Sequence, residues 1–311
     1  MRPAREQHML RYDARYDVFV ELRERMRSSV NAWLVLVDPM SRCATGSLET
    51  AHRKKHIVDL VRFGIDRELC PFILELDGPS DVLLEETVTI AWERCGDWQQ
   101  PQPICGWISS ALPAAAVAGA VLRQAVAVTG DGKRRLERFY DPRVARHAGF
   151  SESARHPFEG ADVWVQLGWD GELQAMPCMT GGYVAPASPI QPDPRAAWCV
   201  AVNAAISQLQ RMDDLTLERE RQLQAAVDCA IHLGLCVEEV ADVTTFLLHK
   251  VLVHPQIERH PVIAEWLREA VAGTGAYADR CAEADAEWWQ GIEHGAWSSN
   301  TNGFNVETRH G

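Results

Sequence analysis

The sequence predicts an α/β (α+β) protein, with an N-terminal lobe built on a mixed β-sheet flanked by helices and an all-α C-terminal lobe. Three observations predict it. Short apolar runs closed by turn residues alternate with helical patterns over the first half of the chain. Apolar residues at helical spacing then fill the chain after Pro194. The length of 311 residues exceeds a typical domain of roughly 100–200 residues, so two structural units are expected.

The boundary between the lobes is expected within residues 177–194. This stretch contains five prolines and the adjacent glycines Gly181 and Gly182, which disfavour a regular helix or strand. The predicted domains are therefore an α/β domain over residues 1–180 and a helical lobe over residues 195–295. Residues 296–311 are polar and contain Asn, Ser and Gly, so a flexible tail is expected there.

An amphipathic helix is expected to open the first lobe. Tyr12, Tyr16, Phe19, Val20 and Met26 fall near helical spacing between charged residues. Buried strands are predicted at residues 32–37 and 71–76, where short apolar runs end at turn residues. A third and a fourth strand are expected at residues 104–109 and 135–140.

Helices are expected between and after these strands, at residues 52–63, 82–95, 113–126 and 142–147. Ser80 is the expected N-cap of the second helix, and Pro113 is expected in the first turn of the third. Further along, apolar and polar residues alternate over 162–167, and a turn at Asp170-Gly171 leads into residues 172–176. This pattern predicts a β-hairpin.

The second lobe is predicted to be a helical bundle. Four apolar stripes at helical spacing lie within residues 223–231, 237–252, 262–271 and 277–288. Gly234, Pro255 and Gly273 mark three of the expected helix ends. Stripes of this kind are typical of core faces.

The charge balance bears on the class of partner. The formal net charge is −12, from 31 Lys and Arg against 43 Asp and Glu. Residues 196–311 carry 8 basic against 17 acidic side chains, or −9, and residues 1–195 carry 23 against 26, or −3. So acidic a second half repels phosphate backbones, and no nucleic-acid partner is predicted.

Cysteine usage and hydropathy bear on the compartment. The nine cysteines are odd in number and form no CxxC pair, and the first 27 residues lack the apolar segment of a secretory signal. A reduced, cytoplasmic protein is therefore expected. The most apolar stretch, residues 108–128, is interrupted by Pro113 and Arg123. It is interpreted as a strand and a packed helix, so no membrane association is predicted.

No motif points to a catalytic site. GxSxG, HExxH and GxGxxG are absent, and the segment 130–133 (GDGK) is followed by Arg134, where a phosphate-binding loop needs Ser or Thr. His52 and His56 have the i, i+4 spacing of a metal half-site but no third ligand. His249, His254 and His260 are interpreted as surface or capping residues. The prediction is that the protein is not an enzyme and has no catalytic residue, no metal and no cofactor.

Residues 138–144 (RFYDPRV) follow a strand of the form AWLVLVD, residues 32–38, at a distance of about a hundred residues. A second strand ending in Leu76-Asp77 and the run Gly106-Trp107-Ile108 occur in the same order. This arrangement, over residues 32–147, resembles the type VI secretion adaptor family, often called Tap or Tec, which was first catalogued as a domain of unknown function.

The resemblance implies a cytoplasmic adaptor or chaperone that binds one type VI effector protein and helps load it onto the VgrG spike protein. Two alternatives remain open. One is a hydrolase-like enzyme with an active site dispersed along the chain, and the other is a structural subunit that stays in a larger assembly.

The candidate site follows from the motif. Asp141 is expected to cap the helix that Pro142 begins, which joins strand and helix at a set angle. Arg138 and Arg143 are expected to pair with acids at the ends of neighbouring strands, such as Asp38 or Asp77. Either this cluster only locks the sheet edge, or an arginine binds a partner carboxylate. The candidate residues are Asp38, Asp77, Arg138, Phe139, Tyr140, Asp141, Pro142 and Arg143.

Overall fold

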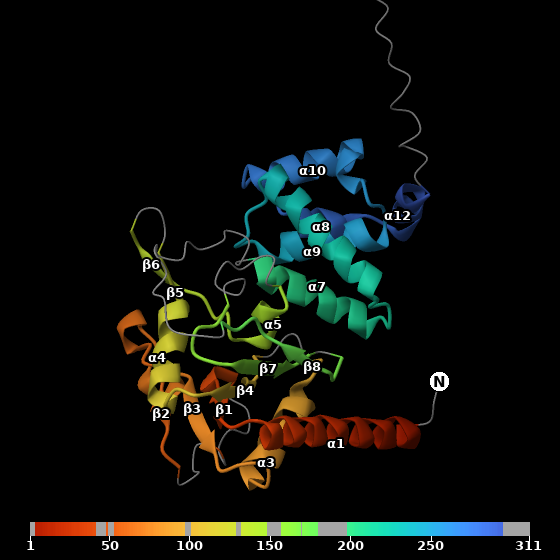
Figure 1. Ribbon diagram of the computed structural model, residues 1–311. Helices are drawn as coiled ribbons and strands as arrows, with labels where there is room; N and C mark the ends of the chain where they lie inside the picture. Colours follow the sequence, from red (N-terminus) through yellow and green to blue (C-terminus); the bar gives the residue numbers. More distant parts are fainter. Residues whose placement is uncertain are drawn as a thin grey trace, which may run out of the picture. The chain divides into compact units, whose positions relative to one another are not determined.

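The computed structural model describes residues 4–41, 48, 53–96, 101–128, 132–147, 157–168, 170–179 and 198–294. The chain divides into two compact units, Met1–Ala196 and Ala197–Gly311, and each is described by itself (Figure 1). Most of the expected boundary segment and the expected tail lie outside the described residues.

The first unit is organised around a six-stranded sheet of order β2-β3-β1-β4-β7-β8. Every pair of neighbouring strands in it is antiparallel. The strands are β1 (Ala32–Val37), β2 (His56–Ile57), β3 (Phe72–Leu76), β4 (Ile104–Ser110), β7 (Val163–Leu167) and β8 (Leu173–Ala175). The unit is thus α+β, as predicted.

The sheet differs from the mixed sheet that the sequence predicted. Helix α3 (Val82–Arg94) joins β3 to β4, and these two strands run in the same direction, as in a β-α-β unit. Strand β1 lies between them and pairs antiparallel with both. The predicted mixed sheet is therefore wrong, because β1 inserts between β3 and β4 and makes both pairings antiparallel.

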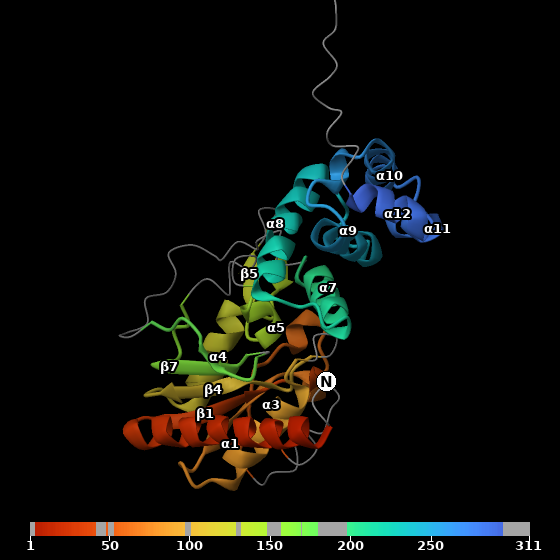
Figure 2. The same ribbon diagram turned by 90° about the vertical axis from the view of Figure 1, so that its right-hand side faces the viewer.

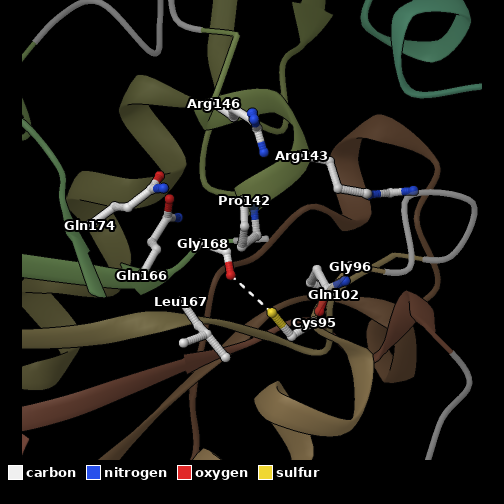
Figure 3. A pocket seen from close by; sticks show the side chains of 10 residues that line it. All are labelled: Cys95, Gly96, Gln102, Pro142, Arg143, Arg146, Gln166, Leu167, Gly168 and Gln174. Atoms are coloured by element: carbon white, nitrogen blue, oxygen red, sulfur yellow. Dashed lines mark hydrogen bonds between the residues drawn. The ribbon is translucent and has the colours of Figure 1, made fainter. Parts of the chain in front are cut away.

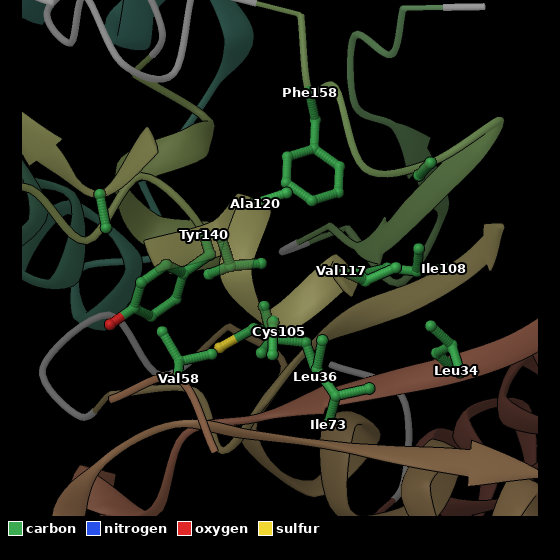
Figure 4. Packing of buried hydrophobic residues seen from close by; sticks show 14 of the residues in the cluster. Leu34, Leu36, Val58, Ile73, Cys105, Ile108, Val117, Ala120, Tyr140 and Phe158 are labelled. Carbon is green, nitrogen blue, oxygen red and sulfur yellow. The ribbon is translucent and has the colours of Figure 1, made fainter. Parts of the chain in front are cut away.

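Both faces of the sheet are covered. Helices α1 (Ala4–Ser28) and α3 pack on one face, and α4 (Ala114–Gln124) packs on the other (Figures 1 and 2). Strand β1 divides its side chains between the two cores, with Val35 in the first and Leu34 and Leu36 in the second. Figure 4 shows the second core, where Leu36, Cys105 and Ile108 of the sheet meet Val117 of α4. Burial of each such side chain contributes about 1.5–3 kcal/mol.

The predicted N-terminal helix is confirmed, but part of its predicted apolar face is wrong. Val18, Leu22 and Met26 are buried, at i, i+4 and i+8 along one row of the helix. Tyr16 instead lies 57% exposed and packs on Phe19 at 6.3 Å between ring centroids. Aromatic rings alone therefore do not mark the buried row.

The predicted helix over residues 52–63 is wrong. His56 and Ile57 form strand β2, which pairs with Ile73 and Phe72 of β3, and a 3-10 turn, η2 (Val61–Phe63), follows. The backbone of this segment is extended because it completes the sheet beside β3. His52 lies outside the described residues, and His56 stands in a strand, so the proposed helical half-site for a metal does not apply.

The predicted strand over residues 135–140 is wrong beyond Leu136. Strand β6 (Arg134–Leu136) pairs with β5 (Val126–Val128) in a separate two-stranded sheet. Phe139 and Tyr140 lie in a turn, which the Asp141 N–H closes by donating to the Arg138 carbonyl at 2.9 Å. Both rings are buried, whereas successive residues of a strand point to opposite faces.

The remaining local predictions agree closely with the structure. Strands β7 and β8 form the predicted hairpin, and α5 (Pro142–Ala145) follows Asp141 as expected. Helix α3 lies where a helix was expected, but its cap is Asp81 rather than Ser80, because the Asp81 carboxylate accepts the Leu83 N–H at 2.9 Å.

The second unit is all-α over its described residues, as predicted. Thr216 caps the start of α8 through the Arg219 N–H, and Gly234 ends it at φ 80°. The helices are α7 (Cys199–Arg211), α8 (Leu217–Leu233), α9 (Val240–Leu252), α10 (Pro261–Val271), α11 (Tyr277–Glu283) and α12 (Ala286–Glu293). Within the described part of the chain, no helix combines the length and the apolar character needed to cross a bilayer.

Candidate functional site

Asp38, Arg138 and Asp141 form a cluster of charged side chains beside the end of β1. Asp38 directly follows β1 and is fully buried, and its carboxylate accepts a hydrogen bond from Arg138 at 2.5 Å. The Met40 N–H donates to the other carboxylate oxygen at 3.0 Å. Arg138 also lies 3.6 Å from the buried carboxylate of Asp141. The predicted pairing of Arg138 with Asp38 is therefore confirmed.

The environment of the cluster shifts its pKa values. Burial raises the pKa of Asp38 above its ordinary value, against the opposing effect of Arg138. Burial disfavours the charge of Arg138, yet Asp38 and Asp141 raise the pKa of its guanidinium above the ordinary value. Burial, followed by Asp38 and Asp141, raises the pKa of the Cys105 thiol well above its ordinary value. The thiol beside the cluster is thus protonated, which is the wrong state for a nucleophile.

Asp141 organises the following helix and the second arginine of the motif. Its Oδ1 accepts the Arg143 N–H at 3.0 Å, which caps α5, with Pro142 in the first turn. The Arg143 side chain returns to the same carboxylate, donating from Nε at 3.1 Å and from a terminal nitrogen at 2.8 Å. Arg143 therefore pairs with Asp141, the cap of its own helix, whereas Asp38 or Asp77 was the expected kind of partner.

The side chains of Phe139 and Tyr140 are buried in the hydrophobic core. Phe139 packs edge-on against Tyr140 and Trp164, with ring centroids 5.7 and 5.8 Å apart. The Gln166 side chain of β7 ties this turn to the sheet, because its Nε2 donates to the carbonyls of Tyr140 and Cys105, each at 2.8 Å. Two buried bonds from one amide hold the motif in one position against the sheet.

Asp77 does not belong to the cluster. The register Trp33↔Leu76 in the antiparallel pair β1·β3 places Asp77 beside the start of β1, whereas Asp38 follows its end. Asp77 is 81% exposed at its side chain and pairs with Arg53 at 2.6 Å. The C-terminal ends of neighbouring strands lie at the same edge of a sheet only when the strands are parallel. Because β1 and β3 are antiparallel, the expectation that placed Asp38 and Asp77 together is wrong.

A pocket lies beside the motif, and its space of about 400 Å³ includes open solvent. Figure 3 shows Arg146, the C-cap residue of α5, extending toward this space, with Gln166 and Gln174 on the hairpin side. Its walls come from the end of α3, the approach to β4, α5 and the β7–β8 hairpin. The lining residues are Cys95, Gly96, Gln102, Pro142, Arg143, Arg146, Gln166, Leu167, Gly168 and Gln174.

Hydrogen bonds between elements shape the pocket floor. The Cys95 thiol donates to the Gly168 carbonyl at 3.0 Å, which links α3 to the hairpin. The Gln102 amide donates to the Arg94 carbonyl at 2.6 Å. None of the described lining residues carries a carboxylate or an imidazole. The pocket therefore presents arginine, amide and thiol groups.

Residues 66–154 match the model of a family described as Domain of unknown function (DUF4123). The match spans β3 to α5 and takes in the whole RFYDPRV segment, Asp77 and the α5 side of the pocket. Asp38 and the β7–β8 hairpin lie outside it. Comparisons with curated proteins and with solved structures returned no match.

Sequence reasoning missed Arg146, Gln166 and Gln174, although it named Asp38, which lies outside the DUF4123 match. Gln166 was placed with Trp164 in the polar positions of the alternating hairpin, yet both side chains are buried. Trp164 stands among the residues that the alternation assigned to the solvent-facing side of β7. A tryptophan at such a position was the available signal that both faces of β7 are buried. Arg146 and Gln174 had no signal, because only folding brings them to one pocket.

Among the described residues of the second unit, a group of polar side chains surrounds His249. The His249 imidazole lies 2.9 Å from the Tyr277 hydroxyl and 3.8 Å from the Cys281 thiol, and the Trp289 ring covers it with centroids 4.4 Å apart. Burial raises the pKa of Cys281 to about 12, so its thiol is protonated at neutral pH. His249 is thus half-buried among Tyr277, Cys281 and Trp289, and it is not the exposed surface residue that was expected.

The pH dependence of stability is expected to report on His249. Burial lowers the pKa of its imidazole to about 4, below the unfolded value of about 6.5. The unfolded chain then binds a proton that the folded chain excludes, so stability is constant above about pH 6.5 and falls as the pH drops toward 4. Urea unfolding at a series of pH values measures this fall.

The matched variants are His249→Gln and His294→Gln. The first removes the buried titrating group, and the second changes an exposed histidine of the same unit. The fall between pH 6.5 and 4 is expected to shrink only in His249→Gln. An equal fall in both variants would assign the effect to other groups.

Across the described ranges, no three His, Cys, Asp or Glu side chains gather as a metal ion requires. The eight described cysteines are all free thiols. Residues 129–131, where a phosphate loop was considered and set aside, lie outside the described residues.

Proposed function

We propose that this protein is a cytoplasmic adaptor that binds one type VI effector protein and helps to load it onto the VgrG spike protein. The observation that carries the proposal is the RFYDPRV segment. It lies within the DUF4123 match, forms a rigid corner through Asp38, Arg138 and Asp141, and borders a solvent-open pocket. A rigid, charged corner beside an open pocket is suited to holding a partner surface.

The chemistry of the site favours binding over the hydrolase alternative. A hydrolase needs a nucleophile or an activated water and a base within hydrogen-bond reach. The Cys105 thiol has a raised pKa, and both carboxylates of the cluster are bonded to arginines. The described lining of the pocket offers no general base. No described feature favours catalysis over binding here.

Co-expression with the effector and the spike encoded beside its gene tests the proposal. The full chain is expected to co-purify with the effector, and deletion of the chain is expected to abolish effector secretion while leaving the secretion apparatus intact. An adaptor is retained in the cytoplasm after the effector leaves, whereas a structural subunit remains stoichiometric in the assembly. A purified chain that binds neither protein would refute the proposed function.

A further inference from the structure

A cysteine and a lysine lie in contact where two helices of the second unit pack together. Cys229 belongs to α8 and Lys250 to the last turn of α9, and these helices lie side by side (Figure 1). The Lys250 ammonium donates to the Cys229 sulfur, with Nζ and Sγ 3.5 Å apart. Because the stem of lysine is flexible, rotation within the two side chains is enough to bring nitrogen and sulfur to bonding distance.

A carboxylate and an aromatic ring hold the lysine at the sulfur. Glu258, in the 3-10 helix η5 (Ile257–Arg259), accepts a hydrogen bond from Lys250 Nζ at 2.8 Å. The side chains of Lys250 and Glu258 are only 12% and 18% exposed. The same ammonium lies 5.8 Å from the centroid of the Phe246 ring. Lys250 is therefore kept beside Cys229, and reactions between groups held together in this way are strongly accelerated.

The thiol itself is half-buried, which leaves it open to a molecule as small as a peroxide. Burial raises the pKa of Cys229 above its ordinary value, while the charge of Lys250 favours the thiolate. The thiolate is the form that peroxides oxidise, so this thiol is expected to react slowly at neutral pH. What distinguishes Cys229 is the amine beside it, which can react with the oxidised sulfur.

We propose that Cys229 and Lys250 form an oxidative modification site, in which a peroxide converts the thiol to a sulfenic acid and the Lys250 amine then condenses with it to a sulfenamide. In the first step, sulfur gives two electrons to the O–O bond of the peroxide. One oxygen is transferred to sulfur, and the other leaves as water or an alcohol.

The second step is a substitution at sulfur without further oxidation. Glu258 lies where it can accept the proton that the Lys250 ammonium must release before it attacks. The nitrogen lone pair then displaces hydroxide from the sulfenic acid, so that an S–N bond forms and the S–O bond breaks. The hydroxide takes up a proton from the nitrogen and leaves as water.

The sulfenamide would join α8 to α9 covalently. A link of this kind reduces the entropy of the unfolded chain, so the oxidised second unit is expected to unfold at a higher temperature than the reduced one. A thiol reductant cleaves the S–N bond, which makes the modification reversible. The link also protects the sulfur of Cys229 from irreversible oxidation to the sulfinic acid.

Mass spectrometry of the purified full chain after treatment with hydrogen peroxide tests the proposal. Trypsin and a glutamate-specific protease separate the two residues into different peptides, because Glu238 and Glu239 lie between them. The expected product is the Cys229 peptide joined to the Lys250 peptide, with the mass of the pair less two hydrogen atoms. Dithiothreitol is expected to separate the two peptides. Cys229 recovered as a sulfinic acid, without linked peptides, would overturn the proposal.

The matched variant is Lys250→Arg, which keeps a positive charge beside Glu258 but replaces the amine with a guanidinium that stays protonated. It is expected to give no linked peptides and no rise in unfolding temperature on oxidation. Cys236→Ser, at an exposed cysteine of the same unit, is expected to form the link as fully as the original chain. Linked peptides that persist in Lys250→Arg, or that are lost in Cys236→Ser, would refute the assignment. The measurement uses no effector, so its outcome is independent of the proposed function.

Discussion

Replacing Arg138 with alanine is expected to lower the free energy of unfolding of the first unit by about 3–5 kcal/mol. The substitution leaves the fully buried Asp38 without its arginine partner at 2.5 Å, and it removes the second arginine near Asp141. A buried carboxylate that loses its partner takes up a proton instead. Because the folded-state pKa of Asp38 is then raised further, the loss of stability is expected to be larger at pH 8 than at pH 5.

Urea unfolding followed by hydrogen exchange in β1 and β4 measures this loss in the unit concerned. Two comparisons separate the pair from general disruption. The double variant Asp38→Asn, Arg138→Met removes both charges and is expected to recover much of the stability. Asp77→Asn, at a carboxylate that is 81% exposed in its side chain, is expected to cost less than about 1 kcal/mol. An Arg138→Ala variant as stable as Asp77→Asn would show that the buried pair does not stabilise the corner.

Gly106→Ala is expected to destabilise the sheet by about 3 kcal/mol or more. Gly106 lies in β4 at φ +131°, where a side chain is strained, and an added Cβ would lie 2.5 Å from the Val165 carbonyl oxygen and in collision with the Trp164 indole nitrogen. The β1–β4 register shifts at this point, so that Leu36 faces Gly106 and Val37 faces Ile104. The glycine is needed because the irregular pairing brings β7 against the backbone of β4.

Thermal unfolding of Gly106→Ala measures the effect. Gly64→Ala is the matched control, because Gly64 also has positive φ, +80°, but an added Cβ there meets nothing within 4 Å. It is expected to cost about 1–2 kcal/mol from backbone strain alone. Equal losses at the two positions would show that close approach of β7 adds nothing at Gly106.

Local chemistry made much of the fold predictable. Three elements could be predicted from neighbouring residues alone. They are β1 from its apolar run, α5 from Asp141-Pro142 at its start, and α9 from its apolar stripe at helical spacing. The failures share one cause. The 52–63 segment and the Phe139-Tyr140 pair take their conformation from distant partners, namely β3 and the aromatic core around Trp164.

The site was predictable to the same extent. The motif drew attention to Arg138 and Asp141 and to the pairing of Arg138 with Asp38 across a hundred residues. It did not reveal that Arg143 returns to Asp141, or that Gln166 fastens the turn to the sheet. Side-chain partners of this kind depend on register and on which face of a strand is covered, and neither is encoded within a few residues.

By itself, the sequence determined which segments are apolar enough to be strands or helices, where Asp141 starts a helix, and that an α+β unit precedes an all-α one. Tertiary structure alone decided that β1 separates β3 from β4, that Asp77 and Asp38 stand at opposite ends of the sheet, and that Arg146 and Gln174 share a pocket. The physical reason is the distance along the sequence over which each kind of interaction acts. Capping and periodicity act between residues a few positions apart, whereas strand order and pocket walls minimise the free energy of the whole packed unit.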